Sequence, residues 1–155
     1  MNEVLRQEKK YPIDLAQGAA LRARLDQIMR RDAHNGAQGY TIRSLYFDTP
    51  DDEDFHDKVD GLELRRKLRL RAYSPDADFA MLEMKQKEGP YQKKRSLRLS
   101  REDAVRLCQG DYGPLKSYPD PFAGECYGLM ACRCYRPKAI VEYLRQAYLA
   151  QENHI

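Results

Sequence analysis

Basic residues alternate with leucines in the segment Leu-Arg-Arg-Lys-Leu-Arg-Leu-Arg at residues 64–71. A β-strand turns successive side chains to opposite faces, so this order separates the two kinds of residue. One face would carry Arg65, Lys67, Arg69 and Arg71. The other would carry Leu64, Leu68 and Leu70, with Arg66 as the exception. Guanidinium forks and ammonium groups in a row suit the oxygens of a phosphate chain.

The next two segments repeat the pattern. At residues 78–88 the polar face would carry Glu83, Lys85 and Lys87, with Ala80, Leu82 and Met84 behind. At residues 91–99 it would carry Lys94, Ser96 and Arg98, opposite Leu97 and Leu99. Residues 62–99 hold eleven Lys and Arg against five Asp and Glu. An amphipathic sheet with its charged face in water is the simpler interpretation. Like charges on neighbouring strands repel each other, however, so three such strands favour a bound polyanion.

Three carboxylates, Glu8, Asp48 and Glu83, lie on segments that otherwise carry cations. Each is either a salt-bridge partner or a ligand of a divalent cation, because Mg²⁺ on phosphates uses one or two carboxylates. The sequence contains no P-loop, dinucleotide fingerprint, zinc-protease motif or nucleophile elbow. Its three histidines, in predicted loops, a turn or the tail, are not expected to act as a catalytic base. Any chemistry would then be charge-stabilised phosphoryl transfer.

The elements that must position these residues follow from periodicity and turn residues. We expect strands at residues 4–11, 40–48, 62–73, 78–88, 91–99 and 138–148, the middle three forming an antiparallel meander. Asp14 and Ser100 are candidate helix N-caps. The first helix would run to about Arg31, with Leu21, Leu25, Ile28 and Met29 on its buried stripe, and the second to about Cys108. An acidic helix or turn would occupy residues 51–59, and residues 110–137, rich in Pro and Gly, would form a loop with one helical turn.

Length and composition predict one soluble α+β domain over residues 1–155. The sequence shows no apolar run long enough to span a membrane and no signal peptide, so a cytoplasmic location is expected. The four cysteines are then expected to be reduced thiols. A zinc site is the alternative, although the spacing at Cys126, Cys132 and Cys134 lacks the usual pair of ligands.

Several of these segments together resemble one family. They are Arg6-x-Glu8-x-Lys10-Tyr11, Ser44-Leu45-Tyr46-Phe47-Asp48-Thr49-Pro50, Gly61, Lys67-x-Arg69-x-Arg71-x-Tyr73, Leu82-Glu83-x-Lys85, Lys94 and Val141-x-Tyr143-x-Arg145-x-Ala147-Tyr148. In this order they are similar to the VTC domain, the polyphosphate polymerase branch of the triphosphate tunnel metalloenzyme (CYTH-like) superfamily.

The resemblance implies an antiparallel β-tunnel with helices packed outside and a bore that holds a triphosphate with Mg²⁺ or Mn²⁺. It implies phosphate-binding roles for Arg6, Lys10, Lys67, Arg69, Arg71, Lys85, Lys94 and Arg145. Of these, Lys10, Arg69, Arg71, Lys85, Lys94 and Arg145 would form the catalytic set, and Glu8 and Glu83 would hold the metal. The implied reaction transfers the γ-phosphate of ATP to a polyphosphate chain. Arg6 stands where hydrolytic relatives have a first Glu, which favours the polymerase over a tripolyphosphatase.

The alternatives are a non-catalytic module that binds polyphosphate or nucleotide, and a tripolyphosphatase-type hydrolase. Nucleic acid is not an expected partner, because only Tyr73 and Phe79 offer aromatic rings near the basic face. The family has further strands after the segment that resembles residues 137–148, so an incomplete tunnel is expected here. Its open edges would favour self-association, and a membrane-protein partner is a further expectation.

Overall fold

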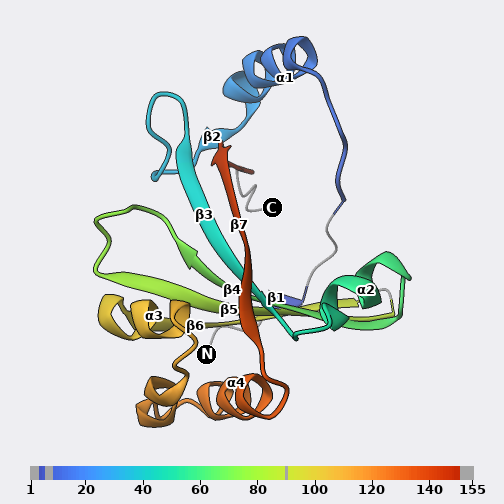
Figure 1. Cartoon of the computed structure of the whole chain (residues 1–155). Helices are drawn as coiled ribbons and strands as arrows, with labels where there is room; N and C mark the ends of the chain where they lie inside the picture. The colour runs from blue at the N-terminus through green and yellow to red at the C-terminus, as the bar shows by residue number, and fades with distance from the viewer. Residues whose placement is uncertain (1–3, 6–8, 90, 151–155) are drawn as a thin grey trace. The chain divides into compact units, whose positions relative to one another are not determined.

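The alternating segments form the three central strands of a sheet in a computed structural model that describes residues 4–5, 9–89 and 91–150. They are β4 (Leu64–Ala72), β5 (Phe79–Glu88) and β6 (Tyr91–Ser100). Each pairs antiparallel with the next, which confirms the meander (Figure 1). β3 (Tyr40–Asp48) pairs antiparallel with β4, and β1 (Val4–Leu5) pairs antiparallel with β6.

The sheet is open in the part of the chain that the structure describes. Its strand order is β1-β6-β5-β4-β3-β7, where β7 is Arg136–Arg145. β1 and β7 therefore lie at opposite edges, and no pairing among the described strands joins them. The α+β class is confirmed. The described strands do not form a closed tunnel. A barrel closes only when its edge strands are paired.

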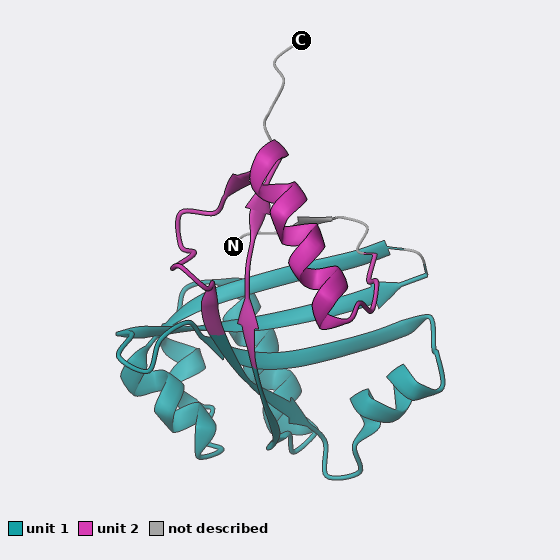
Figure 2. Ribbon diagram, turned by 90° about the horizontal axis from the view of Figure 1, so that it is seen from above, with its two compact units in different colours: residues 1–7, 42–142 teal, residues 8–41, 143–155 magenta. Residues whose placement is uncertain are grey.

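The chain forms two compact units, which Figure 2 colours separately. The first comprises residues 1–7 and 42–142, and it contains most of the six-stranded sheet. The second comprises residues 8–41 and 143–155.

The core of the first unit lies between the apolar face of the sheet and two helices, α3 (Arg101–Cys108) and α4 (Pro121–Cys132) (Figure 1). The sheet contributes Leu68, Leu70, Leu82, Met84 and Leu99, all buried. The helices contribute Ala104, Leu107, Phe122, Cys126 and Met130. Burying one such large side chain stabilises the fold by about 1.5–3 kcal/mol. The apolar side of the predicted alternation is therefore the core side, although Leu64 at its outer end is exposed.

Residues 110–137 are more helical than the sequence suggests. They contain the short 3₁₀ helix η1 (Gly113–Ser117) and the whole of α4, not a loop with one turn. Asp120 caps α4 by accepting from the Phe122 backbone N–H at 2.9 Å. Gly124 and Gly128 are poor helix formers, so propensity predicts a loop. Burial of the side chains at 122, 123, 126 and 130 outweighs it, because this spacing puts them on one side of a helix.

The first predicted strand does not extend to its expected last residues. β1 is described at Val4–Leu5, residues 6–8 lie outside the described part of the chain, and Lys9, Lys10 and Tyr11 lie outside any strand. The register agrees with this, because Leu5 faces Lys93 and β6 begins only two residues earlier, at Tyr91. Pairing with β6 therefore cannot continue as far as Lys9.

The acidic segment after β3 forms α2 (Glu53–Val59), as predicted. Ser100 also caps α3 as predicted, accepting from the Asp103 backbone N–H at 3.1 Å.

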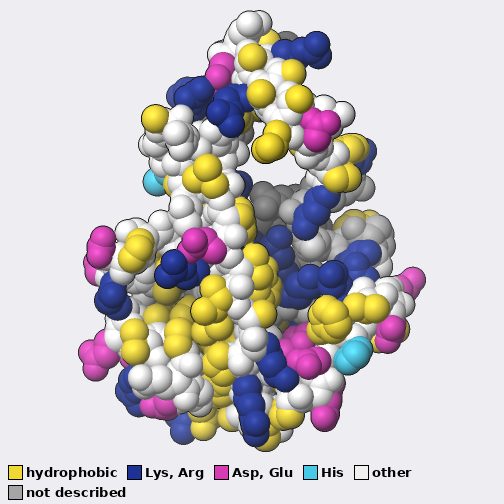
Figure 3. All heavy atoms as spheres, turned by 45° about the horizontal axis from the view of Figure 1, so that its top comes forward, with side chains coloured by type: hydrophobic (Ala, Val, Ile, Leu, Met, Phe, Trp, Pro, Cys, Tyr) yellow, Lys and Arg dark blue, Asp and Glu magenta, His cyan; other side chains and the backbone are white. Residues whose placement is uncertain are grey.

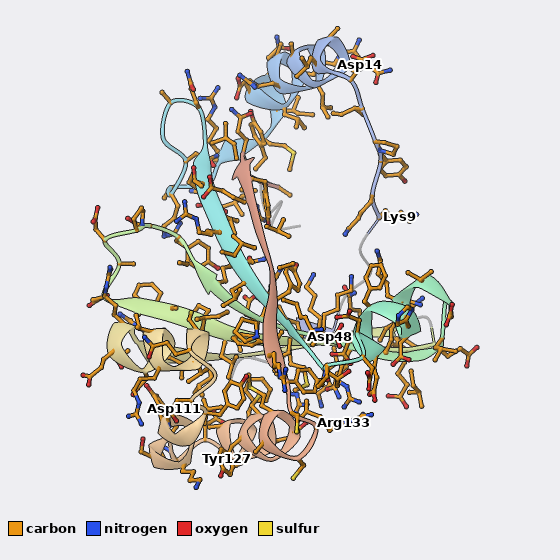
Figure 4. The ribbon with its side chains drawn as sticks, in the orientation of Figure 1. Lys9, Asp14, Asp48, Asp111, Tyr127 and Arg133 are labelled. Atoms are coloured by element: carbon orange, nitrogen blue, oxygen red, sulfur yellow. The ribbon has the colours of Figure 1, made fainter. Side chains whose placement is uncertain are left out.

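The second unit contains α1 (Leu15–Ile28) and a two-stranded sheet of β2 (Arg30–Arg31) and β8 (Tyr148–Leu149). The predicted capping box at Asp14 is present, with Asp14 and Gln17 each accepting from the other's backbone (Figure 4). The predicted buried stripe is wrong, because no residue of α1 is buried and Ile28 is 66% exposed. The other elements of this unit are too short to build a core against the helix. Within the described residues no helix is both long and apolar enough to cross a membrane.

Candidate functional site

Three basic side chains converge on the carboxylate of Glu83, in the middle of β5. Arg69 on β4 reaches Glu83 Oε2 with Nε at 2.8 Å and Nη2 at 2.7 Å. Lys94 on β6 places Nζ 2.5 Å from Oε1, and Arg71 places Nε 3.5 Å from Oε2. We refer to Glu83, Arg69, Arg71 and Lys94 as the Glu83 cluster.

Strand register brings the cluster together. Arg69 lies directly opposite Glu83 across β4 and β5, and Glu83 lies opposite Ser96 on β6. Lys94 is two residues from Ser96 and reaches Glu83 diagonally, a separation that a long side chain spans. The chain therefore brings together four of the residues that the sequence assigns to phosphate or metal binding.

The cluster carries two more positive charges than negative charges, in a largely buried position. Glu83 is 1% exposed, Arg69 8% and Arg71 6%. Burial by itself would raise the pKa of Glu83. The hydrogen bond from Lys94 and the charges of Arg69, Arg71 and Lys94 outweigh burial and hold that pKa below its usual value. Glu83 is thus ionised at neutral pH, yet among the described residues this one carboxylate neutralises only one of the three cations. Buried unpaired charge is costly, so an anionic ligand would stabilise this arrangement.

Tyr46 on β3 extends the cluster. Its phenolic oxygen accepts a hydrogen bond from Arg69 Nη1 at 2.9 Å, and Arg69 lies opposite it in the sheet. Burial disfavours the charged form of Arg69, but the Glu83 charge and the bonds to Glu83 and Tyr46 raise its pKa overall. Tyr46 was not a predicted site residue. Its position on the same face of β3 as Ser44 and Asp48 is the pattern that could have indicated it.

Lys67 and Lys85 form a second row beside the cluster. Lys67 faces Lys85 across β4 and β5, and Lys85 faces Lys94 across β5 and β6. All three side chains are partly buried. The basic face that the alternation predicts across three strands is therefore present in the sheet.

The positions of four other predicted residues relative to this cluster stay predictions. Arg6 and Glu8 lie outside the described residues. Lys10 and Arg145 belong to the second unit, where both are exposed. Arg145 ends β7, and its positive charge helps to lower the pKa of Asp32, after the larger effect of hydrogen bonds from His34.

Asp48 has a structural role in the first unit. Its carboxylate accepts backbone N–H bonds from Asp54 at 3.0 Å and Phe55 at 3.0 Å, in the first turn of α2 (Figure 4). It also accepts from the Thr49 backbone at 2.8 Å. Asp48 therefore fixes the start of α2 beside the end of β3, as a helix cap does.

Arg66 lies on the other face of β4, as the alternation predicts. Its Nε donates to Asp54 Oδ1 at 3.1 Å, and Asp54 Oδ2 accepts from the Tyr135 hydroxyl at 2.9 Å. Burial raises the pKa of Asp54 despite these bonds. Arg66 therefore serves a buried polar network that is separate from the Glu83 cluster.

The described residues contain no group of three or more His, Cys, Asp or Glu side chains that could hold a metal ion. Glu83 is the carboxylate at the basic cluster, and both of its oxygens are engaged by cations. These residues do not fit a metal site built by the protein alone. The four cysteines are free thiols, and burial raises the pKa of Cys126, in the core, to about 12.

Comparison with known proteins identifies a family and solved structures with a similar fold. A model of the VTC domain matches residues 5–155. A provisionally assigned adenylate cyclase from Bacillus halodurans has a similar crystal structure, with a TM-score of 0.60 at 14% sequence identity. The match covers 97% of this chain and 67% of that one. A provisionally assigned adenylate cyclase from Vibrio parahaemolyticus gives a TM-score of 0.51 at 13% identity, over 97% of this chain and 63% of that one. A search of curated proteins found no match.

Proposed function

Because the chain belongs to the VTC domain family, we propose that its first unit binds the phosphate chain of a nucleoside triphosphate or of polyphosphate at the Glu83 cluster. The observation that carries this proposal is the buried excess of positive charge at Arg69, Arg71 and Lys94 around one carboxylate. The CYTH-like fold of the two solved structures supports the same ligand class.

The cluster suits phosphate chemistry for a physical reason. Fixed cations in a site shielded from water stabilise the charge that develops on a transferred phosphoryl group and need no reorganisation. Arg69 would position an equatorial oxygen with its guanidinium fork, and Lys94 would offer a compact charge beside it. Lys67 and Lys85 would continue the cationic track along the phosphate chain.

The specific reaction that we propose is transfer of the γ-phosphate of ATP to a growing polyphosphate chain, with release of ADP. Members of the VTC family include polyphosphate polymerases, which supports this assignment. A divalent cation, Mg²⁺ or Mn²⁺, would neutralise phosphate charge in such a reaction. Glu83 can contribute a ligand only by giving up a contact to Arg69 or Lys94, so the phosphate oxygens would have to supply most of the coordination.

Incubation of the purified chain with ATP and Mn²⁺, followed by a gel that resolves polyphosphate, tests the proposed reaction. We expect a polyphosphate ladder that Arg69→Ala removes. Arg106→Ala is the matched control, because Arg106 is an exposed arginine on α3 that pairs with Asp111. Release of inorganic phosphate without a ladder would instead indicate a hydrolase of the tripolyphosphatase type. Binding of tripolyphosphate with neither product would indicate a non-catalytic module.

A further inference from the structure

Two buried donors face each other across β3 and β4 without a hydrogen-bond partner in the described structure. They are the hydroxyl of Ser44 and Nε of Arg71. Ser44 is 1% exposed and Arg71 6%. Their Cα atoms are direct partners in the register of the two strands. Buried polar groups in folded proteins are almost always paired, so two neighbouring exceptions call for an explanation.

The neighbouring pair on the same two strands, Tyr46 and Arg69, forms the kind of hydrogen bond that Ser44 and Arg71 lack. Tyr46 and Arg69 are also direct partners, and there the phenolic oxygen accepts a bond from the guanidinium at 2.9 Å. Ser44 lies two residues earlier, so its side chain points to the same face of the sheet as Tyr46. The serine side chain is shorter by a ring, and its hydroxyl makes no hydrogen bond to Arg71. Neither the Ser44 hydroxyl nor Arg71 Nε therefore has a hydrogen-bond partner among the described residues.

We infer that Ser44 is a further phosphate-binding residue, whose hydroxyl and the Arg71 Nε donate to one oxygen of the bound phosphate chain. This inference rests on the proposed function of the Glu83 cluster. Arg71 Nε already lies 3.5 Å from Glu83 Oε2, so the pair adjoins the cluster. The two excess positive charges favour an anionic oxygen there over a water molecule. A metal cation is disfavoured there, because the Arg71 guanidinium is positively charged and offers no lone pair.

Replacement of Ser44 by alanine should affect the affinity for a phosphate ligand and the stability of the free protein differently. Removing a buried hydroxyl that has no internal partner costs the free protein nothing, and the change can be neutral or stabilising. We therefore expect Ser44→Ala to keep or raise the thermal midpoint of the free chain. In contrast, its affinity for tripolyphosphate, measured by titration calorimetry on the full chain, should fall about tenfold, because a hydrogen bond to a charged oxygen is lost.

Ser117→Ala is the matched control. The Ser117 hydroxyl donates to the Pro114 carbonyl at 2.7 Å within η1. Its loss should lower the thermal midpoint slightly and leave the tripolyphosphate affinity unchanged.

A double-mutant cycle tests whether the two donors share an oxygen. Arg71→Lys keeps the positive charge and removes Nε. If both donors bind one oxygen, Ser44→Ala should cost clearly less affinity in the Arg71→Lys background than in the wild type. Fully additive losses would overturn the shared contact.

The outcomes separate this inference from the function on which it rests. Normal tripolyphosphate affinity in Ser44→Ala would overturn the Ser44 assignment and leave the proposed function standing. A lower thermal midpoint of free Ser44→Ala would also overturn the assignment, because the hydroxyl would then have an internal structural role. A wild-type chain that binds no tripolyphosphate would overturn both.

Discussion

Glu83 is a carboxylate whose burial is tolerated because three cations surround it. The sequence left two roles for it, salt-bridge partner and metal ligand. In the structure it is the internal counter-ion of Arg69, Arg71 and Lys94. A phosphate ligand of the proposed kind would compete with Glu83 for the same donors.

Glu83→Gln should destabilise the free protein strongly. Breaking a buried ion pair by removing one partner typically lowers the free energy of unfolding by about 3–5 kcal/mol. Tripolyphosphate should recover part of that loss, so its stabilising effect should be larger in the variant than in the wild type. Urea unfolding with and without tripolyphosphate measures both effects. Glu142→Gln is the control, since Glu142 forms an exposed pair with Arg43 and should matter by less than about 1 kcal/mol.

The pKa of Glu83 also gives a pH dependence. Because the folded state holds this pKa below its usual 4.5, the carboxylate stabilises the fold above that value. This contribution is lost as the pH falls through the lowered pKa. We expect the wild type to lose stability steeply in that acid range and Glu83→Gln to show a shallower loss. Equal slopes for the two proteins would contradict the role of Glu83 as counter-ion.

The charged members of the site could be predicted from the sequence, because a period of two separates them from the leucines. Arg69, Arg71, Glu83 and Lys94 lie together as the alternation requires. The alternation along β3 puts Ser44 and Tyr46 on one face, but it does not show which residues of β4 they meet. Tyr46 bonds to Arg69 and Ser44 lies opposite Arg71 because of the register between β3 and β4, which is not visible in a single sequence.

At the scale of elements, strands were easier to predict than helices. The strands from β3 to β6 are set by alternation and by turn residues, and their observed bounds lie within two residues of the expected ones. The sequence does not predict α4, because the helix contains two glycines and lies in a proline-rich segment. These residues disfavour a helix more strongly than the helical spacing of the apolar residues favours one. Tertiary burial of Phe122, Cys126 and Met130 decides the structure there.

Two glycine substitutions test this difference between propensity and packing. Gly124 lies in α4, and a Cβ there would meet nothing within 4 Å. Gly124→Ala should therefore stabilise the protein by about 0.5–1 kcal/mol. Gly39 has a φ of +105°, and a Cβ there would lie 2.3 Å from the Arg145 carbonyl oxygen. Gly39→Ala should destabilise the protein. Thermal unfolding measures both, and destabilisation by Gly124→Ala would show that α4 does not form as described.

At the scale of the whole molecule, the described strands give an open sheet in which β7 is an edge. Ile140, Val141 and Leu144 on this strand are all exposed, and hydrophobic side chains reach the surface of the face shown in Figure 3. The tunnel expected from the family resemblance requires a pairing partner at such an edge. The basic face does not depend on that closure, because its central residues come from β4, β5 and β6.

The membership of the VTC family and the CYTH-like fold were both indicated by sequence motifs and are confirmed by comparison. The roles that the resemblance implies for Lys10 and Arg145 stay predictions. Both residues lie in the second unit, and local periodicity carries no information about how distant segments meet.

Titration calorimetry of tripolyphosphate against the wild type, Arg69→Ala and Arg66→Ala tests the central claim most directly. Both arginines lie on β4, but Arg69 contacts Glu83 whereas Arg66 contacts Asp54 on the opposite face. We expect Arg69→Ala to weaken binding about tenfold or more and Arg66→Ala to bind almost as the wild type does. Equal losses in the two variants, or no binding by the wild type, would contradict a phosphate site at the Glu83 cluster.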